Sequence, residues 1–177
     1  MPQVTIVVGN PKVGSRTREV AEGLARQLIE PGSTEVRMIE LAEYSAELFD
    51  WESERVKEAV AAVGSSDLVI FASPTFKAGY TGLLKAFLDR FSANGLAGIV
   101  AIPVHTGATS GHSMAANHIL GPLLTELGAL VPGRGLYVSI AELENADQLT
   151  RSAADQYRRN LERASTLVAV HPASSFV

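Results

Sequence analysis

The chain contains no cysteine among its 177 residues. Thiol catalysis, disulfide bonds and thiolate metal sites are therefore excluded, and nothing in the composition requires an oxidising compartment. An excess of positive charge is also missing, because 15 lysines and arginines stand against 19 acidic residues and the net charge is -4. This balance gives no electrostatic reason to expect binding to nucleic acid or to anionic lipid.

Long apolar runs are absent too. No stretch approaches the roughly 18 apolar residues of a membrane span, and the N-terminus lacks the charged and apolar segments of a secretion signal. We therefore expect a cytoplasmic protein without membrane contact. With no internal repeat or low-complexity tract, and with 46% hydrophobic and 19% charged residues, the composition is typical of one globular domain. We expect this domain at residues 1–170, followed by a flexible tail at 171–177.

What the sequence does contain is a regular alternation of short apolar runs and longer amphipathic segments. The apolar runs predict β-strands near 3–9, 34–41, 67–72, 98–104 and 134–140. The amphipathic segments predict helices near 16–29, 52–63, 80–92, 112–128 and 145–169. Strands separated by helices favour parallel pairing, so we expect an α/β fold, a three-layer sandwich on a five-stranded parallel sheet. Ligands of such sheets bind at the carboxyl ends of the strands.

The loop after the first expected strand has the composition of a phosphate-binding loop. The apolar run Val4–Val8 ends in Gly-Asn-Pro, and a helix then begins near Ser15, where unpaired N–H groups carry the positive end of the helix dipole. A phosphate there would also meet the hydroxyls of Ser15 and Thr17 and the charges of Lys12 and Arg16. The pattern is neither a Walker loop nor a G-x-G-x-x-G fingerprint. An ordinary capped strand-to-helix loop is the alternative.

The loops after the third and fourth expected strands are rich in small and polar residues. Residues 73–82 include Pro74, Phe76 and Tyr80, which suit a flat ring whose polar edge is held by backbone groups. The alternative is that the two aromatic side chains only fill the core. Residues 103–112 place two glycines among hydroxyl residues, which lets the backbone approach a ligand closely. All three loops fall at one edge of the expected sheet, which favours a shared ligand site.

In this order the three loops resemble those of the flavodoxin-like NADPH-dependent FMN reductases. The similarity runs from about Val4 to about Leu167 and implies the flavodoxin-like fold. That family more often has serine and arginine at the places of Asn10 and Lys12, and tyrosine at that of Phe76. The positions that match its flavin-contacting loops are Asn10, Lys12, Ser15, Arg16, Thr17, Pro74, Thr75, Phe76, Lys77, Tyr80, Thr106, Gly107, Ala108 and Thr109.

The resemblance implies an NAD(P)H:FMN oxidoreductase that uses FMN and NADPH, with NADH as the other nucleotide to consider. Hydride would pass to N5 of the flavin, so no side chain is expected to be catalytic, and Lys77 and His118 are candidate modulators. The closest likeness is to reductases that supply reduced FMN to two-component alkanesulfonate or methanesulfonate monooxygenases. Two alternatives stay open: an FMN-bound reductase of quinones, azo dyes or chromate, and a flavodoxin-type electron carrier. The modest net charge of -4 argues against the carrier.

The expected helix at 112–128 carries more apolar surface than one core face needs. Within it, Pro122 has no N–H to donate to the carbonyl of His118, so we predict a kink or a π-bulge near His118. The alternative is a proline-kinked helix with a solvent-facing histidine. The resembling sulfonate-type reductases carry a π-helix here at an oligomer interface beside the flavin, which implies a homo-oligomer, and we expect a tetramer. The apolar residues are Met114, Ala115, Ala116, Ile119, Leu120, Leu123, Leu124 and Leu127.

Other chemistries find little support in the sequence. His105 and His112 flank the third loop without further metal ligands at useful spacing, so no metal site is expected. Ser15 stands in no G-x-S-x-G elbow, which argues against a hydrolase. Trp51 precedes the second expected helix, and we interpret it as a packing residue.

Overall fold

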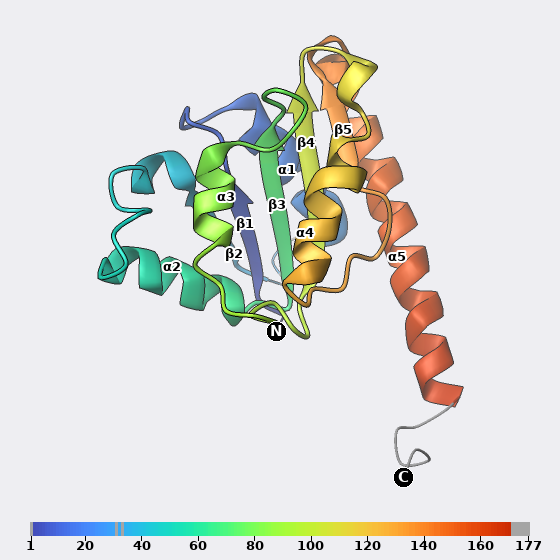
Figure 1. Cartoon of the computed structure of the whole chain (residues 1–177). Helices are drawn as coiled ribbons and strands as arrows, with labels where there is room; N and C mark the ends of the chain where they lie inside the picture. Colours follow the sequence, from blue (N-terminus) through green and yellow to red (C-terminus); the bar gives the residue numbers. More distant parts are fainter. Residues whose placement is uncertain (1, 31, 33, 171–177) are drawn as a thin grey trace.

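The computed structural model describes residues 2–30, 32 and 34–170, so the expected tail at 171–177 lies outside the described residues. Five parallel strands form one sheet in the order β2-β1-β3-β4-β5 (Figure 1). This strand order is that of flavodoxin-like folds, with a switch in direction between β1 and β3. The predicted fold class is therefore confirmed. The strands are β1 (Val4–Val8), β2 (Val36–Glu40), β3 (Leu68–Pro74), β4 (Val100–Gly107) and β5 (Leu136–Ser139).

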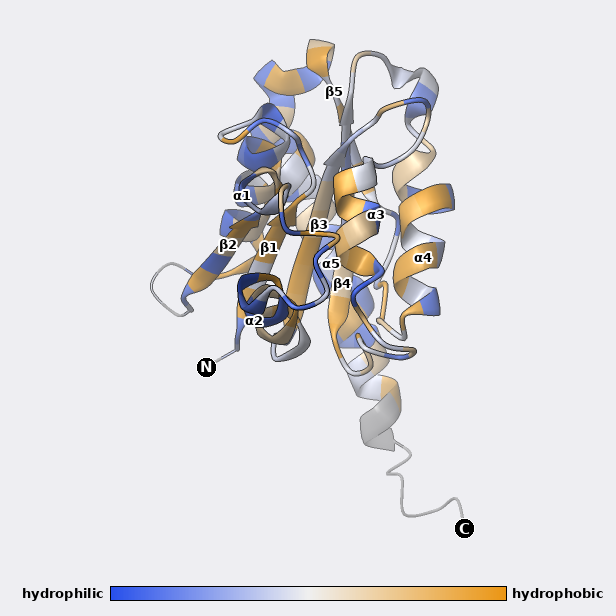
Figure 2. Ribbon diagram, turned by 60° about the vertical axis from the view of Figure 1, so that its left-hand side comes forward, coloured by the Kyte–Doolittle hydropathy of each residue, from blue (hydrophilic) through white to orange (hydrophobic). Residues whose placement is uncertain are grey.

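Helices cover both faces of the sheet, as the first two figures show (Figures 1 and 2). One face packs against α1 (Arg16–Leu28) and α5 (Ala146–Val170). The other packs against α2 (Glu54–Gly64), α3 (Gly82–Leu88) and α4 (Gly121–Glu126).

The two core layers follow from the alternation of side chains along the strands. Ile6 and Val8 of β1 belong to the cluster on the α1 and α5 side, whereas Val7 between them belongs to the cluster on the opposite side. Hydrophobic residues are concentrated in β1, β3 and β4 (Figure 2). These central strands are buried along nearly their whole length, and they therefore hold their carboxyl ends in fixed positions.

Hydroxyl caps fix where three of the helices begin. Ser15, Ser53 and Thr81 each accept a hydrogen bond from the backbone N–H three residues later. Such caps satisfy donors that have no partner inside the helix. The caps of α1 and α3 also fix the ends of two of the loops that sequence reasoning singled out.

The predicted helix at 112–128 is divided into several segments. A 3₁₀ turn, η2 (Ser110–His112), precedes a π-helical segment, η3 (Ala116–Leu120), which continues directly into α4. In the π segment the N–H of Gly121 donates to the carbonyl of Ala116, five residues earlier. The prediction of a π-bulge near His118 is confirmed, and Pro122 stands in the first turn of α4 as the expected cause.

The extent of α3 and the presence of two short 3₁₀ segments also differ from the expectations. The helix expected to reach residue 92 ends at Leu88, because the chain then follows turns in which Arg90 and Phe91 donate to carbonyls three residues earlier. Two 3₁₀ segments, η1 (Leu41–Tyr44) and η4 (Ile140–Asn145), were not expected.

Trp51 is not a core packing residue. Its side chain is 62% exposed, and the Arg90 guanidinium carbon lies 4.6 Å from its ring centroid. The indole therefore packs against a surface cation.

Within the ranges that the structure describes, no helix has both the length and the apolar character needed to cross a membrane.

Candidate cofactor site

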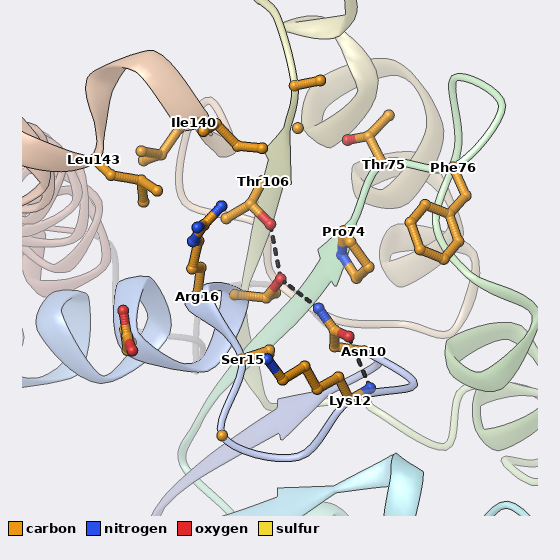
Figure 3. Close-up of a pocket in the computed structure, with 16 residues that line it drawn as sticks. Asn10, Lys12, Ser15, Arg16, Pro74, Thr75, Phe76, Thr106, Ile140 and Leu143 are labelled. Carbon is orange, nitrogen blue, oxygen red and sulfur yellow. Dashed lines mark hydrogen bonds between the residues drawn. The ribbon is translucent and has the colours of Figure 1, made fainter.

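A cavity of about 590 Å³ opens at the carboxyl edge of the sheet, beside the switch in strand order (Figure 3). All the site residues predicted from the sequence line it except Lys77, Tyr80 and Thr109. The lining residues are Asn10, Lys12, Gly14, Ser15, Arg16, Thr17, Glu19, Pro74, Thr75, Phe76, Thr106, Gly107, Ala108, Val138, Ile140 and Leu143.

The loop after β1, residues 9–17, is tied to the end of β4 by hydroxyl groups. The Asn10 side-chain oxygen accepts the Lys12 N–H at 2.9 Å, and its Nδ2 donates to Thr17 Oγ1 at 3.0 Å. Thr17 Oγ1 lies 2.7 Å from Thr106 Oγ1 (Figure 3). Thr17 is almost fully buried. Its hydroxyl already has two protein partners, Asn10 and Thr106.

A buried carboxylate holds the same loop from the side of β2. Gly14 has a φ of 63°, and its N–H donates to Glu40 Oε1 at 2.8 Å. The second oxygen of Glu40 accepts from Arg18 Nη1 at 2.6 Å. Sequence reasoning missed Glu40. The available signal was an acidic residue at the carboxyl end of an expected strand.

The groups at the start of α1 form a donor set that fits a phosphate monoester. Ser15 Oγ accepts the Arg18 N–H, which leaves the hydroxyl hydrogen free to donate. Arg16 projects from the helix start toward Leu143 (Figure 3), and Lys12 is exposed on the loop. Among the described residues neither cation forms an ion pair, so both charges are available to an anion at the positive end of the helix.

The loop after β3 ends in a two-residue turn. Phe76 and Gly79 donate their N–H groups to each other's carbonyls at 2.9 and 3.1 Å. Between them Lys77 and Ala78 have φ values of 51° and 66°, a left-handed conformation that costs residues with a Cβ about 1–2 kcal/mol each. Phe76 is 54% exposed at the rim of the cavity, opposite Arg16 (Figure 3). The cavity therefore has a cationic end and an end with an exposed aromatic ring.

The loop at residues 73–82 is called the ring loop below, because its residues were predicted to hold the flavin ring. Two of these predicted residues lie away from the cavity lining. Lys77 is exposed at the tip of the turn. Tyr80 packs against the core cluster on the side of α2, α3 and α4, as the alternative reading of this aromatic residue had it.

A buried histidine lies behind this loop. His105 on β4 is fully buried, and its Nδ1 lies 3.0 Å from Thr75 Oγ1. Its Nε2 has no hydrogen-bond partner among the described residues. Burial lowers the pKa of His105 to about 4, so the ring is neutral near pH 7. The Thr75 N–H donates to the Thr106 carbonyl at 2.7 Å, which ties the same residue to β4 by its backbone.

The loop after β4 is closed by a tyrosine from β5. The Tyr137 hydroxyl donates to the Thr109 carbonyl at 2.6 Å. A Cβ on Gly107 would lie 2.1 Å from that hydroxyl oxygen, so a side chain at this position would displace the Tyr137 ring. Thr109 itself is exposed and lies beyond the cavity lining.

An apolar wall of the cavity was not anticipated. Val138 near the end of β5 lines it, and Ile140 and Leu143 of η4 line the side that faces Arg16 (Figure 3). A capping box between Ser139 and Glu142 holds the start of η4. The missed signal was an apolar residue, Ile140, at the end of the fifth expected strand.

The π segment lies beside the loop at residues 73–82 and does not line the cavity. His118 is exposed, and a Cβ built on Gly79 would lie 4.0 Å from Ile119 Cγ2. On the inner side, Asn117 Oδ1 accepts the Gly135 N–H at 2.7 Å. Across the part of the chain that the structure describes, no group of three or more histidine, cysteine or acidic side chains is arranged to hold a metal ion.

Fold and site together define a class. A parallel sheet in the order 2-1-3-4-5, with a helix start rich in donors and cations and a second loop bearing an exposed aromatic ring at its switch point, has the arrangement of flavodoxin-like folds, in which FMN binds at this point.

The chain belongs to the NADPH-dependent FMN reductase family, whose model matches residues 2–143. It is therefore an oxidoreductase that uses FMN and a nicotinamide nucleotide. It is 28% identical to an FMN reductase (NADPH) of Pseudomonas aeruginosa over 93% of this chain and 91% of the relative. It is 27% identical to the NADH-dependent FMN reductase SfnE of Pseudomonas putida over 96% and 94%. The structure of an NADH:FMN oxidoreductase (EMOB) in its apo form superposes with a TM-score of 0.80 at 28% identity, covering 90% of this chain and 88% of the other.

Proposed function

We propose that the chain reduces FMN with a nicotinamide nucleotide and releases the reduced flavin to a separate flavin-dependent monooxygenase of sulfonate or sulfur assimilation. The observation that carries the proposal is the shared cavity, in which Lys12 and Arg16, which form no ion pair within the described part of the chain, lie opposite the exposed ring of Phe76. Relatives named SfnE and SfnF, both NADH-dependent FMN reductases, support the link to such systems. Relatives named for NADPH and for NADH both occur, so the preferred nucleotide is part of the test.

At the cationic end, the proposed contacts to the FMN phosphate come from Ser15, Arg16 and Lys12 and from the first N–H groups of α1. Thr17 and Asn10 would complete this end, with Thr17 also tying the loop to β4. Such a site is built before the ligand arrives, because the loop already has its protein hydrogen bonds.

At the other end, the ring system would lie between two loops. Pro74, Thr75 and Phe76 line one side of the cavity, and Thr106, Gly107 and Ala108 line the other. We propose that Tyr80 and Thr109 hold these loops from outside the lining. When bound, FMN supplies the hydride-accepting group, and the chain's own residues orient it and exclude water. Lys77, at the exposed tip, is placed to offer positive charge to the reduced ring or to a nucleotide phosphate.

An assay of NADPH and NADH oxidation separates the candidate functions. We expect colourless purified protein to oxidise nucleotide at a rate that rises with added FMN. Oxidation supported by a quinone without added FMN would instead favour a reductase with tightly bound flavin. No oxidation of either nucleotide with FMN present would overturn the proposal and favour an electron carrier.

We also propose a homotetramer that assembles through the segment 112–128. Two apolar side chains of this segment, Met114 and Ile119, are 56% and 37% exposed, and a subunit contact through the segment would cover them. Light scattering at micromolar concentration tests this, and a monomer at that concentration would contradict it.

His118 is proposed to act on flavin exchange through the π segment. Ile119, the next residue, borders Gly79 of the ring loop, so a change of helical register would reach that loop. Deletion of His118 should restore a regular register, and we expect the purified variant to retain FMN and to lose transfer of reduced flavin to a partner while NADPH still reduces it. A colourless variant with unchanged NADPH oxidation in the presence of free FMN would show that the π segment is only structural.

A further inference from the structure

Glu40 is a buried carboxylate beneath the proposed phosphate end of the cavity, although it does not line that cavity. It is the last residue of β2 and pairs in register with Val8, the last residue of β1, so it stands where loop 9–17 begins. The residue is only 4% exposed, and both of its oxygens are used. One accepts the Gly14 N–H, and the other accepts from the Arg18 guanidinium.

The bond to Gly14 fixes the part of the loop that leads directly into α1. Gly14 adopts a left-handed backbone, and no atom lies within 4 Å of a Cβ built there. Conformation, and not space, therefore makes this a glycine position. The next residue is Ser15, which is extended and caps the helix. A charge-assisted bond to the Gly14 N–H thus sets the direction from which Ser15 and the first helical N–H groups face the cavity.

A negative charge below an anion site is unfavourable unless it is neutralised. Arg18 neutralises it at 2.6 Å, and Arg18 also binds Glu22 on the outer side of α1 at 2.9 Å. The carboxylate therefore keeps its ability to accept from Gly14 while its charge is shared with a cation on the same helix. This arrangement suits a group that shapes the loop and does not touch the ligand.

We propose that Glu40 is the positioning residue of the phosphate end, and that it makes the site select a phosphorylated flavin over the same flavin without phosphate. The proposal rests on the proposed function, because it needs the FMN phosphate at loop 9–17. Its signature is a loss of affinity confined to the phosphorylated ligand. A residue that only stabilised the fold would weaken both flavins together.

The test is a comparison of Glu40→Ala with Glu40→Gln, with Kd measured by flavin fluorescence for FMN and riboflavin at one ionic strength. Glu40→Ala removes the acceptor, and we expect FMN to bind about tenfold more weakly while the riboflavin Kd stays within about twofold. Glu40→Gln loses the acceptor for Arg18 but keeps one oxygen for the Gly14 N–H, so its FMN Kd should stay within about threefold of the wild type. Glu22→Ala is the matched control, because it removes only the outer partner of Arg18, and it should leave both Kd values unchanged.

Several results would overturn the proposal. They are an equal loss for both flavins in Glu40→Ala, no loss for either, or a Glu40→Gln variant as weak as Glu40→Ala. If Glu40→Ala does not fold by circular dichroism, Glu40→Asp takes its place, since it keeps the charge but is too short to reach both partners. The same selective loss is then expected. Equal affinity of the wild type for FMN and riboflavin would instead be a failure of the proposed phosphate site itself.

Discussion

The loops after β1 and β3 face one cavity but are held in different ways. Loop 9–17 is tied to other elements by side chains, through Glu40 on one side and Thr106 on the other. The turn at 76–79 closes on itself by two backbone hydrogen bonds, and its two central residues are in a left-handed conformation without being glycine. The first loop is fixed by the rest of the fold along its length, whereas the tip of the second, residues 76–79, is a local structure.

This difference matches what the two ends of a flavin need. A phosphate is recognised by donors that must already point at it, so ordering the loop in advance lowers the cost of binding. A ring that a nicotinamide must reach and that later leaves the site needs walls that adapt. We therefore expect changes in loop 9–17 to alter affinity strongly, and changes at 76–79 to alter stability and exchange more than affinity.

The largest effect is expected from Ser15→Ala combined with Thr17→Ala. If both hydroxyls bind the FMN phosphate, each lost bond to a charged group costs about 1.5–3 kcal/mol, which together weakens FMN at least about 100-fold. Part of the effect would pass through Asn10, which loses its bond to Thr17. Riboflavin affinity should barely change. Isothermal titration with both flavins measures the difference.

Ser53→Ala is the matched control for this variant, because Ser53 caps α2 as Ser15 caps α1 but lies away from the cavity. Removing a cap costs about 1 kcal/mol of stability at either position. Only the Ser15→Ala and Thr17→Ala variant should bind FMN more weakly than the wild type. Equal losses for FMN and riboflavin would refute the phosphate assignment and remove the basis of the comparison between the loops.

An intermediate effect is expected from pH on the stability of the fold, through the protonation of His105 behind the ring loop. Burial lowers its pKa to about 4, below the ordinary value of 6.5 that applies once the chain unfolds. Between these values the unfolded chain binds the proton and the folded one does not, so stability is complete above pH 6.5 and falls as the pH drops toward 4. The contribution of this one group is on the order of 3 kcal/mol. Urea unfolding from pH 7 to 4 measures it.

Carboxylates also titrate in this range, so the comparison needs His105→Asn. Asparagine offers a polar atom near the place of Nδ1 for the Thr75 hydroxyl but does not take up a proton. Its stability should fall less steeply with acid than that of the wild type. Parallel curves for the two proteins would mean that the imidazole is accessible to protons in the folded state.

Much of the fold could be predicted because it depends on local patterns. The short apolar runs identified all five strands, and their alternation with helices identified the parallel sheet. Pro122 identified the π-bulge, because the missing N–H of a proline can be recognised from that one residue of the sequence. The early end of α3 was missed because turns at residues 89–97 replace a helical pattern that continues in the sequence.

The site was predictable where one segment carries the whole signal, and not where distant segments meet. The helix start at Ser15 is visible in a few consecutive residues. Glu40 stands 26 positions from Gly14, and an acidic residue at a strand end looks like an ordinary surface group until the register of β1 and β2 is known. The wall of Ile140 and Leu143 is likewise a product of the sheet order, which brings β5 beside β4.

The smallest effect on stability is expected from exchanging glycine and alanine at two left-handed positions, Gly14 and Ala78. Ala78→Gly removes the cost of a Cβ at a φ of 66° and should stabilise the protein by about 0.5–1 kcal/mol, after the larger chain entropy of glycine is counted. Gly14→Ala is the reverse change in the other loop, at a φ of 63° with open space around the new Cβ. It should destabilise by about 1 kcal/mol.

The sharper readout is FMN affinity in the same pair of variants. Gly14→Ala strains the loop that Glu40 holds, so we expect it to weaken FMN while riboflavin is unaffected. Ala78→Gly should leave both affinities within about twofold, because the turn keeps its two backbone bonds and touches the cavity only through Phe76. If Ala78→Gly weakened FMN as much as Gly14→Ala does, the turn would be as rigidly coupled to the ligand as the phosphate loop. The division into a fixed end and an adaptable end would then be wrong.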